Sequence, residues 1–170
     1  MSVVHVVGDL LKSDEQFIAH GCNTKGAMGA GIAGVIARAY PEVERVYSAH
    51  CRTRDFMVGT CLPVTVDERD FRRTVFNLGT QRLPGADATY WGVMLSFGNL
   101  FEYCVAHGIT RVGIPRVGCD IGGLDWNSVE WVINGIYDWV PDGPKVVVYT
   151  LPNNVAKFGP TPYVEYAEAA

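Results

Sequence analysis

Short apolar segments rich in β-branched residues alternate along the chain with longer segments in which apolar residues recur every three or four positions. The short segments predict strands, because glycine, proline or polar residues bound each of them. They are 3–7, 17–22, 58–65, 74–80, 112–115 and 146–151. Several are almost wholly apolar, which is typical of central strands covered on both faces.

The longer segments predict helices, because their apolar residues form stripes at helical spacing. The stripes cover 32–39, 43–47, 90–104 and 129–140. Pro41 suits the first turn of the second helix, and Asn127 with Glu130 has the spacing of a variant capping box for the fourth. We interpret the stripes as core packing, with Met94 and Trp131 included.

Alternating strand and helix signals predict an α/β fold, a three-layer α/β/α sandwich with a mixed central sheet. The chain has 170 residues, of which 48% are hydrophobic and 19% charged, so one globular domain is expected. We assign that domain to residues 1–152. Residues 153–170 show no clear stripe and are expected to drape over the surface or to be partly mobile.

Charge and cysteine content narrow the classes of partner. A net charge of −4 excludes the broad basic field that tight, sequence-independent nucleic-acid binding needs. No apolar run is long enough to cross a bilayer and no secretion signal opens the chain, so we expect a cytoplasmic, monomeric protein with no membrane partner. The five cysteines show neither disulfide nor metal-ligand spacing, so we expect reduced thiols and no metal.

Two glycine-rich loops, 21–33 and 117–126, each connect a predicted strand to a predicted helix. Glycines let the backbone approach a ligand closely, and a helix N-terminus carries a partial positive charge. One such loop alone would more simply indicate a tight turn. Two at the same edge of a sheet favour a cradle for both phosphates of a diphosphate, formed by backbone amides.

Familiar glycine motifs fit this chain less well. Lys25 precedes its glycines and no Ser or Thr follows a Gly-Lys pair, so the P-loop pattern is absent from the sequence. Gly29, Gly31 and Gly34 do form a Gly-x-Gly-x-x-Gly fingerprint, which leaves an NAD-dependent oxidoreductase as an alternative. The acidic residue expected about 20 positions later has no clear candidate.

Four segments of the chain form a further pattern. They are His-Gly-Cys-Asn at 20–23, leading into 28–33, then Ile-Pro-Arg-Val-Gly-Cys at 114–119 and Gly-Leu-x-Trp at 123–126. Together these segments resemble a macrodomain. The resemblance runs from 3 to about 151 and is to the branch with terminal ADP-ribose protein glycohydrolase, ADP-ribose 1″-phosphate phosphatases and antitoxins that reverse DNA ADP-ribosylation. It implies a macrodomain fold that binds ADP-ribose or an ADP-ribosylated substrate without a cofactor. Nucleic acid is then a partner only where it carries ADP-ribose.

The resemblance also implies which residues surround the ligand. Asp9 and Leu10 meet the adenine, although a helix cap or turn is the simpler interpretation of Asp9. The first glycine loop, with Asn23 behind it, embraces the distal ribose, and the second loop embraces the diphosphate. The implied ligand-binding set is Asp9, Leu10, Gly29, Ala30, Gly31, Ile32, Thr80, Gln81, Gly118, Cys119, Ile121, Gly122, Gly123, Leu124 and Asn153.

In the glycohydrolase a strand-end lysine attacks the distal ribose, assisted by an aspartate. Here Gln81 stands at the lysine position and Gly122 at the aspartate position, and a glutamine amide is no nucleophile. We therefore expect hydrolysis of an ADP-ribose derivative without a catalytic lysine, with His20, Asp120 and Asn23 as candidate catalytic residues.

Each candidate also has a structural interpretation. His20 suits a core hydrogen bond, Asp120 suits a loop cap, and Asn23 suits a turn cap. Cys22 and Cys119 are interpreted as small packing residues, and a non-catalytic ADP-ribose-binding module remains the alternative function.

Overall fold

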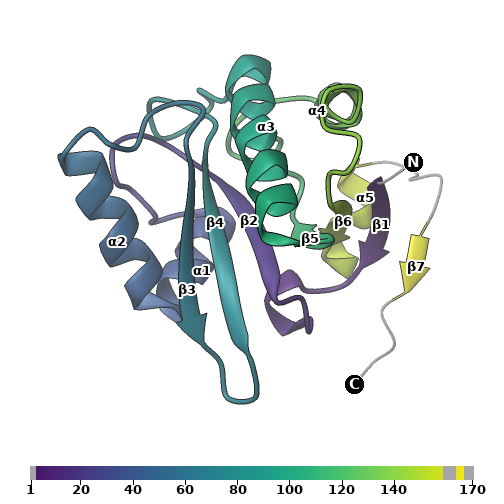
Figure 1. The fold of residues 1–170 in the computed structure, drawn as a ribbon, viewed down its shortest axis with the longest axis horizontal. Coiled ribbons are helices and arrows are strands. Elements are labelled where there is room, and N and C mark those ends of the chain that lie inside the picture. Colours follow the sequence, from purple (N-terminus) through teal and green to yellow (C-terminus); the bar gives the residue numbers. More distant parts are fainter. Residues whose placement is uncertain (1–2, 159–163, 167–170) are drawn as a thin grey trace.

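The computed structural model describes residues 3–158 and 164–166, with one mixed sheet between two helical layers (Figure 1). In these residues the sheet has seven strands in the order β3-β4-β2-β5-β6-β1-β7. β3 runs antiparallel to β4, and every other neighbouring pair is parallel. The bounds are β1 Val3–Val7, β2 Phe17–Cys22, β3 Cys61–Asp67, β4 Arg72–Gly79, β5 Arg111–Ile114, β6 Lys145–Thr150 and β7 Val164–Tyr166. The predicted sandwich with a mixed sheet is confirmed.

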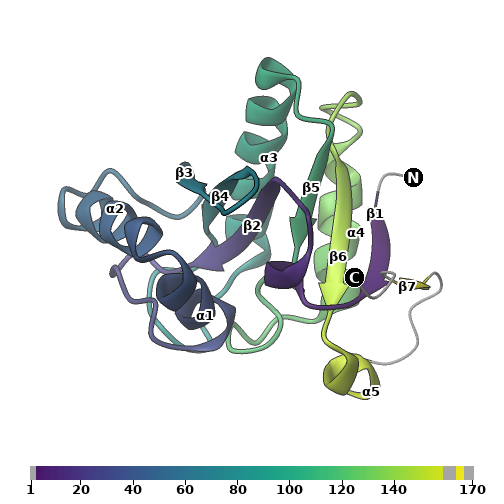
Figure 2. The same ribbon diagram turned by 90° about the horizontal axis from the view of Figure 1, so that it is seen from below.

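Helices cover both faces of this sheet. The described helices are α1 Gly31–Ala39, α2 Pro41–Arg52, α3 Tyr90–His107, α4 Trp126–Ile136 and α5 Val155–Phe158, with the 3₁₀ turns η1 Leu10–Lys12 and η2 Pro152–Asn154. α1 and α2 pack on one face, and α3 and α4 pack on the other, as the view along the sheet shows (Figure 2). None of the described helices is both long and apolar enough to cross a membrane.

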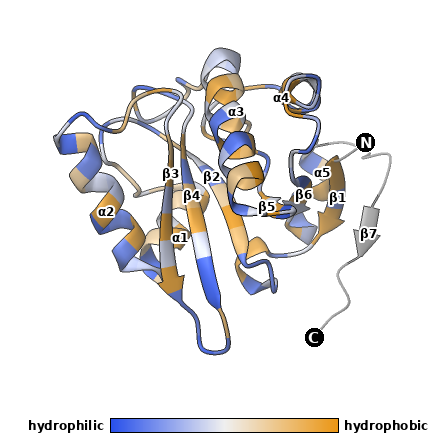
Figure 3. Cartoon of the chain, viewed as in Figure 1, coloured by the Kyte–Doolittle hydropathy of each residue, from blue (hydrophilic) through white to orange (hydrophobic). Residues whose placement is uncertain are grey.

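Two hydrophobic cores explain why the strand segments are almost wholly apolar. Successive side chains of a strand point to opposite faces, so each central strand contributes to both cores. In β6, Val146 and Val148 pack beneath α3 and α4, whereas Val147 and Tyr149 pack beneath α1 and α2. Hydrophobic residues accordingly fill the strands, while the tip of the β3–β4 hairpin is polar (Figure 3).

The start and end of α4 differ from the prediction. Asp125 caps the helix by accepting a hydrogen bond from the Ser128 amide at 2.9 Å, so the capping box predicted from Asn127 and Glu130 is wrong. The Glu130 carboxylate instead accepts from the Trp126 ring nitrogen at 2.9 Å. The helix ends at Ile136, four residues before the end of the predicted stripe at residue 140.

The hydrophobic pattern also predicted the burial of Trp131 wrongly. Its side chain is 77% exposed, because the buried face of α4 is formed by Val129, Ile133 and Ile136, and Trp131 lies off that face. Met94, which was also interpreted as a core residue, is half-buried. Apolar content alone therefore overestimated the buried face of α4.

The structure gives β3 and β4 more polar ends than the sequence predicted. Their antiparallel pairing extends to Asp67 opposite Arg72, beyond the apolar pattern of both segments. In the tail 153–170, α5 and β7 were not predicted, and β7 pairs in parallel with β1. The prediction that this tail drapes over the surface also covers residues 159–163 and 167–170, which lie outside the described residues.

Two aromatic truncations distinguish the core from the surface. Phe97 is fully buried between α3 and the sheet, so Phe97→Ala is expected to lower the free energy of unfolding by about 3–5 kcal/mol. Trp131→Ala is expected to change it by less than about 0.5 kcal/mol. Urea denaturation of both variants measures the difference, and equal losses would contradict the assignment of the two faces.

Candidate functional site

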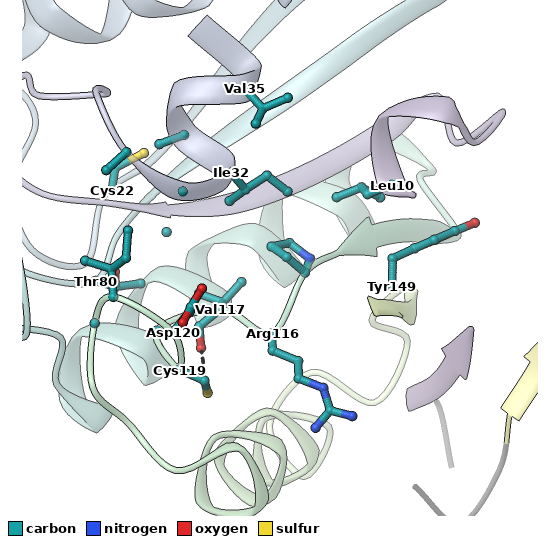
Figure 4. Close-up of a pocket in the computed structure, with 18 of the residues that line it drawn as sticks. Leu10, Cys22, Ile32, Val35, Thr80, Arg116, Val117, Cys119, Asp120 and Tyr149 are labelled. Carbon is teal, nitrogen blue, oxygen red and sulfur yellow. Dashed lines mark hydrogen bonds between the residues drawn. The ribbon is translucent and has the colours of Figure 1, made fainter. Parts of the chain in front are cut away.

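The described residues enclose a cavity of about 660 Å³ at the carboxyl edge of the sheet. Loops that follow five parallel strands, β1, β2, β4, β5 and β6, line it, because parallel strands end at the same edge. Open α/β sheets bind ligands at this edge, and the volume lies in the range of small-molecule sites. Leu10 and Ile32 approach the cavity from one side, and Cys119 and Asp120 from the other (Figure 4).

Asn23 organises the first glycine loop from within. Its Oδ1 accepts hydrogen bonds from the backbone amides of Lys25 and Ala27 at 2.9 and 3.3 Å. The Tyr47 hydroxyl donates to the Asn23 backbone carbonyl at 2.6 Å and lies 3.0 Å from Oδ1. Asn23 Nδ2 donates to the Ala27 carbonyl at 2.8 Å. The turn-capping interpretation of Asn23 therefore describes the structure, while the side chain also lines the cavity and keeps one further amide hydrogen.

The N-terminus of α1 opens into the cavity. Its N-cap is Ala30, which provides no side-chain hydrogen bond. Gly31, Ile32 and Ala33 line the cavity, and the first amides of a helix have no acceptor within the helix itself. This end of α1 presents N–H donors and the positive end of the helix dipole, which suits an anion.

The second glycine loop faces this helix end. Gly118 has φ +77°, and its carbonyl accepts from the Leu124 amide at 2.9 Å. A Cβ on Gly122 would lie 2.6 Å from the Gly118 carbonyl oxygen, so the turn needs glycine there. Ile121 Cδ1 lies 3.0 Å from the position that a Cβ on Gly31 would take, so the two loops meet across the cavity.

Most residues of the predicted ligand-binding set line the cavity. Four predicted site residues do not: His20, Gly123, Leu124 and Asn153. Leu124 packs behind the second loop against Gly118, and Asn154 lines the cavity in place of Asn153. The sequence placed the last loop correctly but not its cavity-facing side chain, because a 3₁₀ turn, η2, forms there.

The structure contradicts the catalytic prediction for His20. The ring is fully buried beneath the cavity, and its Nε2 lies 2.8 Å from Asn77 Oδ1. Burial lowers the pKa of His20 to about 4, against the opposing effect of the Asn77 hydrogen bond. A neutral ring without access to the cavity cannot exchange protons with a ligand, so His20 is a core histidine.

Asp120 is, with Asp9, one of the two acidic residues in the described lining of the cavity. It forms an ion pair with Lys157 of α5 at 2.5 Å, so this pair joins the second loop to the last helix. The Arg116 side chain extends away from the cavity (Figure 4). Its Nε donates to Thr150 Oγ1 at 3.2 Å and its guanidinium lies over the Trp126 ring at 5.4 Å, so it is held in the wall.

Gln81 supports the loop after β4. Its Nε2 donates to the carbonyls of Leu83 and Gly85 at 2.6 and 2.9 Å, which uses both amide hydrogens. Thr80 beside it is buried, and its Oγ1 has no hydrogen-bond partner among the described residues. Both residues line the cavity, and Gln81 is engaged as a structural side chain.

The adenine end predicted by the resemblance is formed by the loop after β1. Asp9 lines the cavity, and its Oδ1 accepts from the Leu11 amide at 3.0 Å, so it caps η1 as the simpler interpretation held. Tyr149 forms the wall beside it, with its hydroxyl donating to Glu15.

Sequence reasoning missed several lining residues. They include Val35, Pro84, Tyr149, Thr150 and Asn154. Val35 belongs to an apolar helical stripe and Tyr149 to an apolar strand segment. The pattern assigns both to the core, so the sequence carried no signal that separates them from their neighbours.

The cavity thiols are not nucleophiles at neutral pH. Burial raises the pKa of Cys119 to about 12, and burial raises the pKa of Cys22 well above its ordinary value. The thiolate is the reactive form, so both serve as packing residues. All five cysteines are free, while the cytoplasmic location and the monomeric state stay predictions.

These features define a class of protein: an α/β sandwich with a nucleotide-sized cleft whose donors are backbone amides. The family model of the Macro domain matches residues 19–133, more than half of the chain. The chain belongs to the Macro domain family. This membership leaves the oxidoreductase alternative without support.

Relatives and solved structures agree with this membership. A DNA ADP-ribosyl glycohydrolase of Mycobacterium tuberculosis is 28% identical over 140 residues, which cover 82% of this chain and 40% of the relative. The chain therefore spans 40% of that relative's length. An ADP-ribose 1″-phosphate phosphatase of Lodderomyces elongisporus is 28% identical, covering 79% of this chain and 92% of the relative. The macrodomain of Mycobacterium tuberculosis DarG matches with a TM-score of 0.78 at 27% identity, covering 86% and 96%.

The burial of His20 predicts a pH-dependent stability. The unfolded state takes up a proton near pH 6.5, whereas the folded state takes it up only near pH 4, so stability present above about pH 6.5 is lost as the pH falls toward 4. His20→Gln removes this component. Between pH 7.5 and pH 4.5, the gap in unfolding free energy between wild type and variant is expected to narrow by about 2–3 kcal/mol in urea titrations. A constant gap would contradict the low pKa.

Proposed function

We propose that this protein binds ADP-ribose and hydrolyses an ADP-ribose derivative. The observation that carries the proposal is the uncapped N-terminus of α1 facing the second glycine loop across the cleft. A diphosphate needs several donors at one point, and backbone amides supply them without a cation. The relatives named as a DNA ADP-ribosyl glycohydrolase and an ADP-ribose 1″-phosphate phosphatase support the ligand and the reaction class.

In this arrangement the ligand lies along the carboxyl edge of the sheet. The adenine lies near Leu10 and Tyr149, and the diphosphate lies between α1 and the second loop. The distal ribose lies near Asn23 and Gln81. The free amide hydrogen of Asn23 donates to a ribose hydroxyl, and the hydrogen bonds that hold its Oδ1 keep it in place.

The reaction proceeds without a lysine nucleophile in this proposal. Lysine is not among the described residues that line the cleft, and both amide hydrogens of Gln81 are engaged. Asp120 is the residue that we assign to water activation, since its carboxylate lies at the cleft and His20 is buried. The Asp120 carboxylate accepts a proton from water as the water oxygen bonds to the anomeric carbon. The bond to the attached group breaks, and that group leaves with the bonding electron pair and takes up the proton that Asp120 then releases.

A non-catalytic ADP-ribose-binding module is the second candidate. The ion pair between Asp120 and Lys157 supports it, because a carboxylate engaged by a lysine is less available to position a water molecule. Both functions use the same cleft, so they differ only in turnover.

Binding is tested by filling the cleft at Gly29. A Cβ at this position meets nothing within 4 Å, so Gly29→Val leaves the fold intact and puts an isopropyl group beside the N-terminus of α1. The dissociation constant for ADP-ribose in calorimetry is expected to rise about tenfold or more. Gly98→Val is the control, an equally open glycine on α3 outside the cleft. Equal affinities in all three proteins would place the ligand elsewhere.

Catalysis is tested at Asp120. Asp120→Asn is expected to slow release of ADP-ribose by about 100-fold or more, because a general base contributes about 10²–10⁴-fold. Affinity for ADP-ribose is expected to persist. The substrates are ADP-ribose 1″-phosphate and glutamyl-, aspartyl-, seryl- and nucleic-acid-linked ADP-ribose. Wild-type inactivity on every linkage would support the binding module, and an unchanged rate in the variant would remove Asp120 from the reaction.

A further inference from the structure

A second cavity of about 710 Å³ lies beside the cleft, among the described residues. It is lined by Thr24, Lys25, Cys51, Arg52, Arg54, Phe56, Met57, Val58, Arg82 and Leu83. We call it the basic groove. Segments 23–25 and 81–85 line the groove on one side and the cleft on the other. Thr24 joins them by donating from its amide and its hydroxyl to the Arg82 carbonyl, at 3.2 and 3.1 Å, so the two cavities share a wall.

The charge of the groove is opposite to that of the protein. Lys25, Arg52, Arg54 and Arg82 are exposed and line it, and its described lining contains no acidic residue, in a chain of net charge −4. Over the described residues, none of the four forms an ion pair with a carboxylate. Four such cations around one cavity point to an anionic ligand with more than one charged group.

Arg54 gives a second, independent observation. It follows the C-cap Thr53 of α2 and has φ +62°, the one non-glycine residue with positive φ in the described part of the chain. Helices commonly place glycine at this position, because a Cβ is strained in the left-handed region. Arg52 is explained by the negative end of the α2 dipole, but Arg54 is not explained by the backbone. The side chain at residue 54 is kept at a cost to stability.

We propose that the basic groove binds the phosphodiester backbone of a single nucleic-acid strand that carries the ADP-ribose. The proposal rests on the function proposed above, which places the distal ribose at the shared wall. Guanidinium groups bind phosphates through paired hydrogen bonds. Met57 and Leu83, which are 57% and 45% exposed, add apolar surface at the groove against which bases pack. The charged side chains of an acidic peptide would not pack against this surface.

The net charge explains why this binding depends on the ADP-ribose. The acidic remainder of the protein repels a free strand, so the groove alone binds it weakly. Once the ADP-ribose occupies the cleft, the attached strand meets the groove at high effective concentration. The groove thus determines which macromolecule is preferred and leaves the affinity for free ADP-ribose unchanged.

The test compares two variants in an Asp120→Asn background, which slows cleavage of the probe. One carries Arg52→Gln and Arg54→Gly, and the control carries Arg69→Gln at the β3–β4 hairpin, at the opposite edge of the sheet. Arg54→Gly keeps or raises the melting temperature, because glycine relieves the positive φ. A loss of binding is then not a loss of folding.

Three labelled probes are titrated by fluorescence anisotropy: an ADP-ribosylated single-stranded oligonucleotide, the same strand bare, and an ADP-ribosylated acidic peptide. Unlabelled ADP-ribose is titrated by calorimetry. The groove variant is expected to bind the ADP-ribosylated strand about tenfold more weakly than the control. The slope of log affinity against log salt is expected to fall by about 1.4, because each of the two removed arginines neutralises one phosphate and contributes about 0.7.

Each outcome decides the proposal. If the groove variant and the control bind the ADP-ribosylated strand equally well and both bind ADP-ribose normally, the proposed role of the basic groove is wrong. The proposed binding of ADP-ribose in the cleft then still stands. If the groove variant loses affinity only for the ADP-ribosylated acidic peptide, the groove binds an acidic peptide and the proposal of a nucleic-acid strand is wrong. Absence of ADP-ribose uptake by every protein overturns the proposed function and this inference together. A loss confined to the ADP-ribosylated strand supports the groove.

Discussion

The candidate site depends on one constraint: backbone amides must converge on a single point. Parallel strands end at the same edge of the sheet, so the loops after β2 and β5 meet there. Gly31 and Gly122 allow the close approach, since side chains at these positions would strike Ile121 and the Gly118 carbonyl. The uncapped start of α1 then supplies donors that no side chain satisfies among the described residues.

Buried polar side chains hold this edge in place. Arg73 is almost fully buried and donates to the carbonyls of Leu11 and Ser13, at 3.2 and 2.6 Å, which fixes the loop after β1. Glu15 accepts from the Tyr149 hydroxyl at 2.9 Å beneath the same end of the cleft. Buried charges are costly to leave unpaired, so these networks determine one arrangement of the loops. The cleft is preorganised by residues that do not line it as well as by those that do.

The distribution of charge separates two kinds of anion recognition. Inside the cleft the donors are amides, because Arg116 is held in the wall by Thr150 and Trp126. The four cationic side chains line the basic groove instead, on the other side of the wall that the hydrogen bond between Thr24 and the Arg82 carbonyl holds together. A fixed ring of amides suits a diphosphate of constant shape, whereas flexible arginines suit a ligand whose phosphates vary in position. An acidic protein can in this way recognise anions locally without attracting nucleic acid over its whole surface.

The sequence by itself determined the architecture. The apolar periods gave β1 and β2 at their observed bounds, and the glycines of 21–33 and 117–126 located the two loops, because period and glycine placement are local properties. The tertiary structure alone decided that His20 faces the core, that Trp131 faces solvent and that Gln81 is occupied by its own loop. Those outcomes depend on which face packs against which layer and on partners distant in sequence, and a periodic pattern encodes neither.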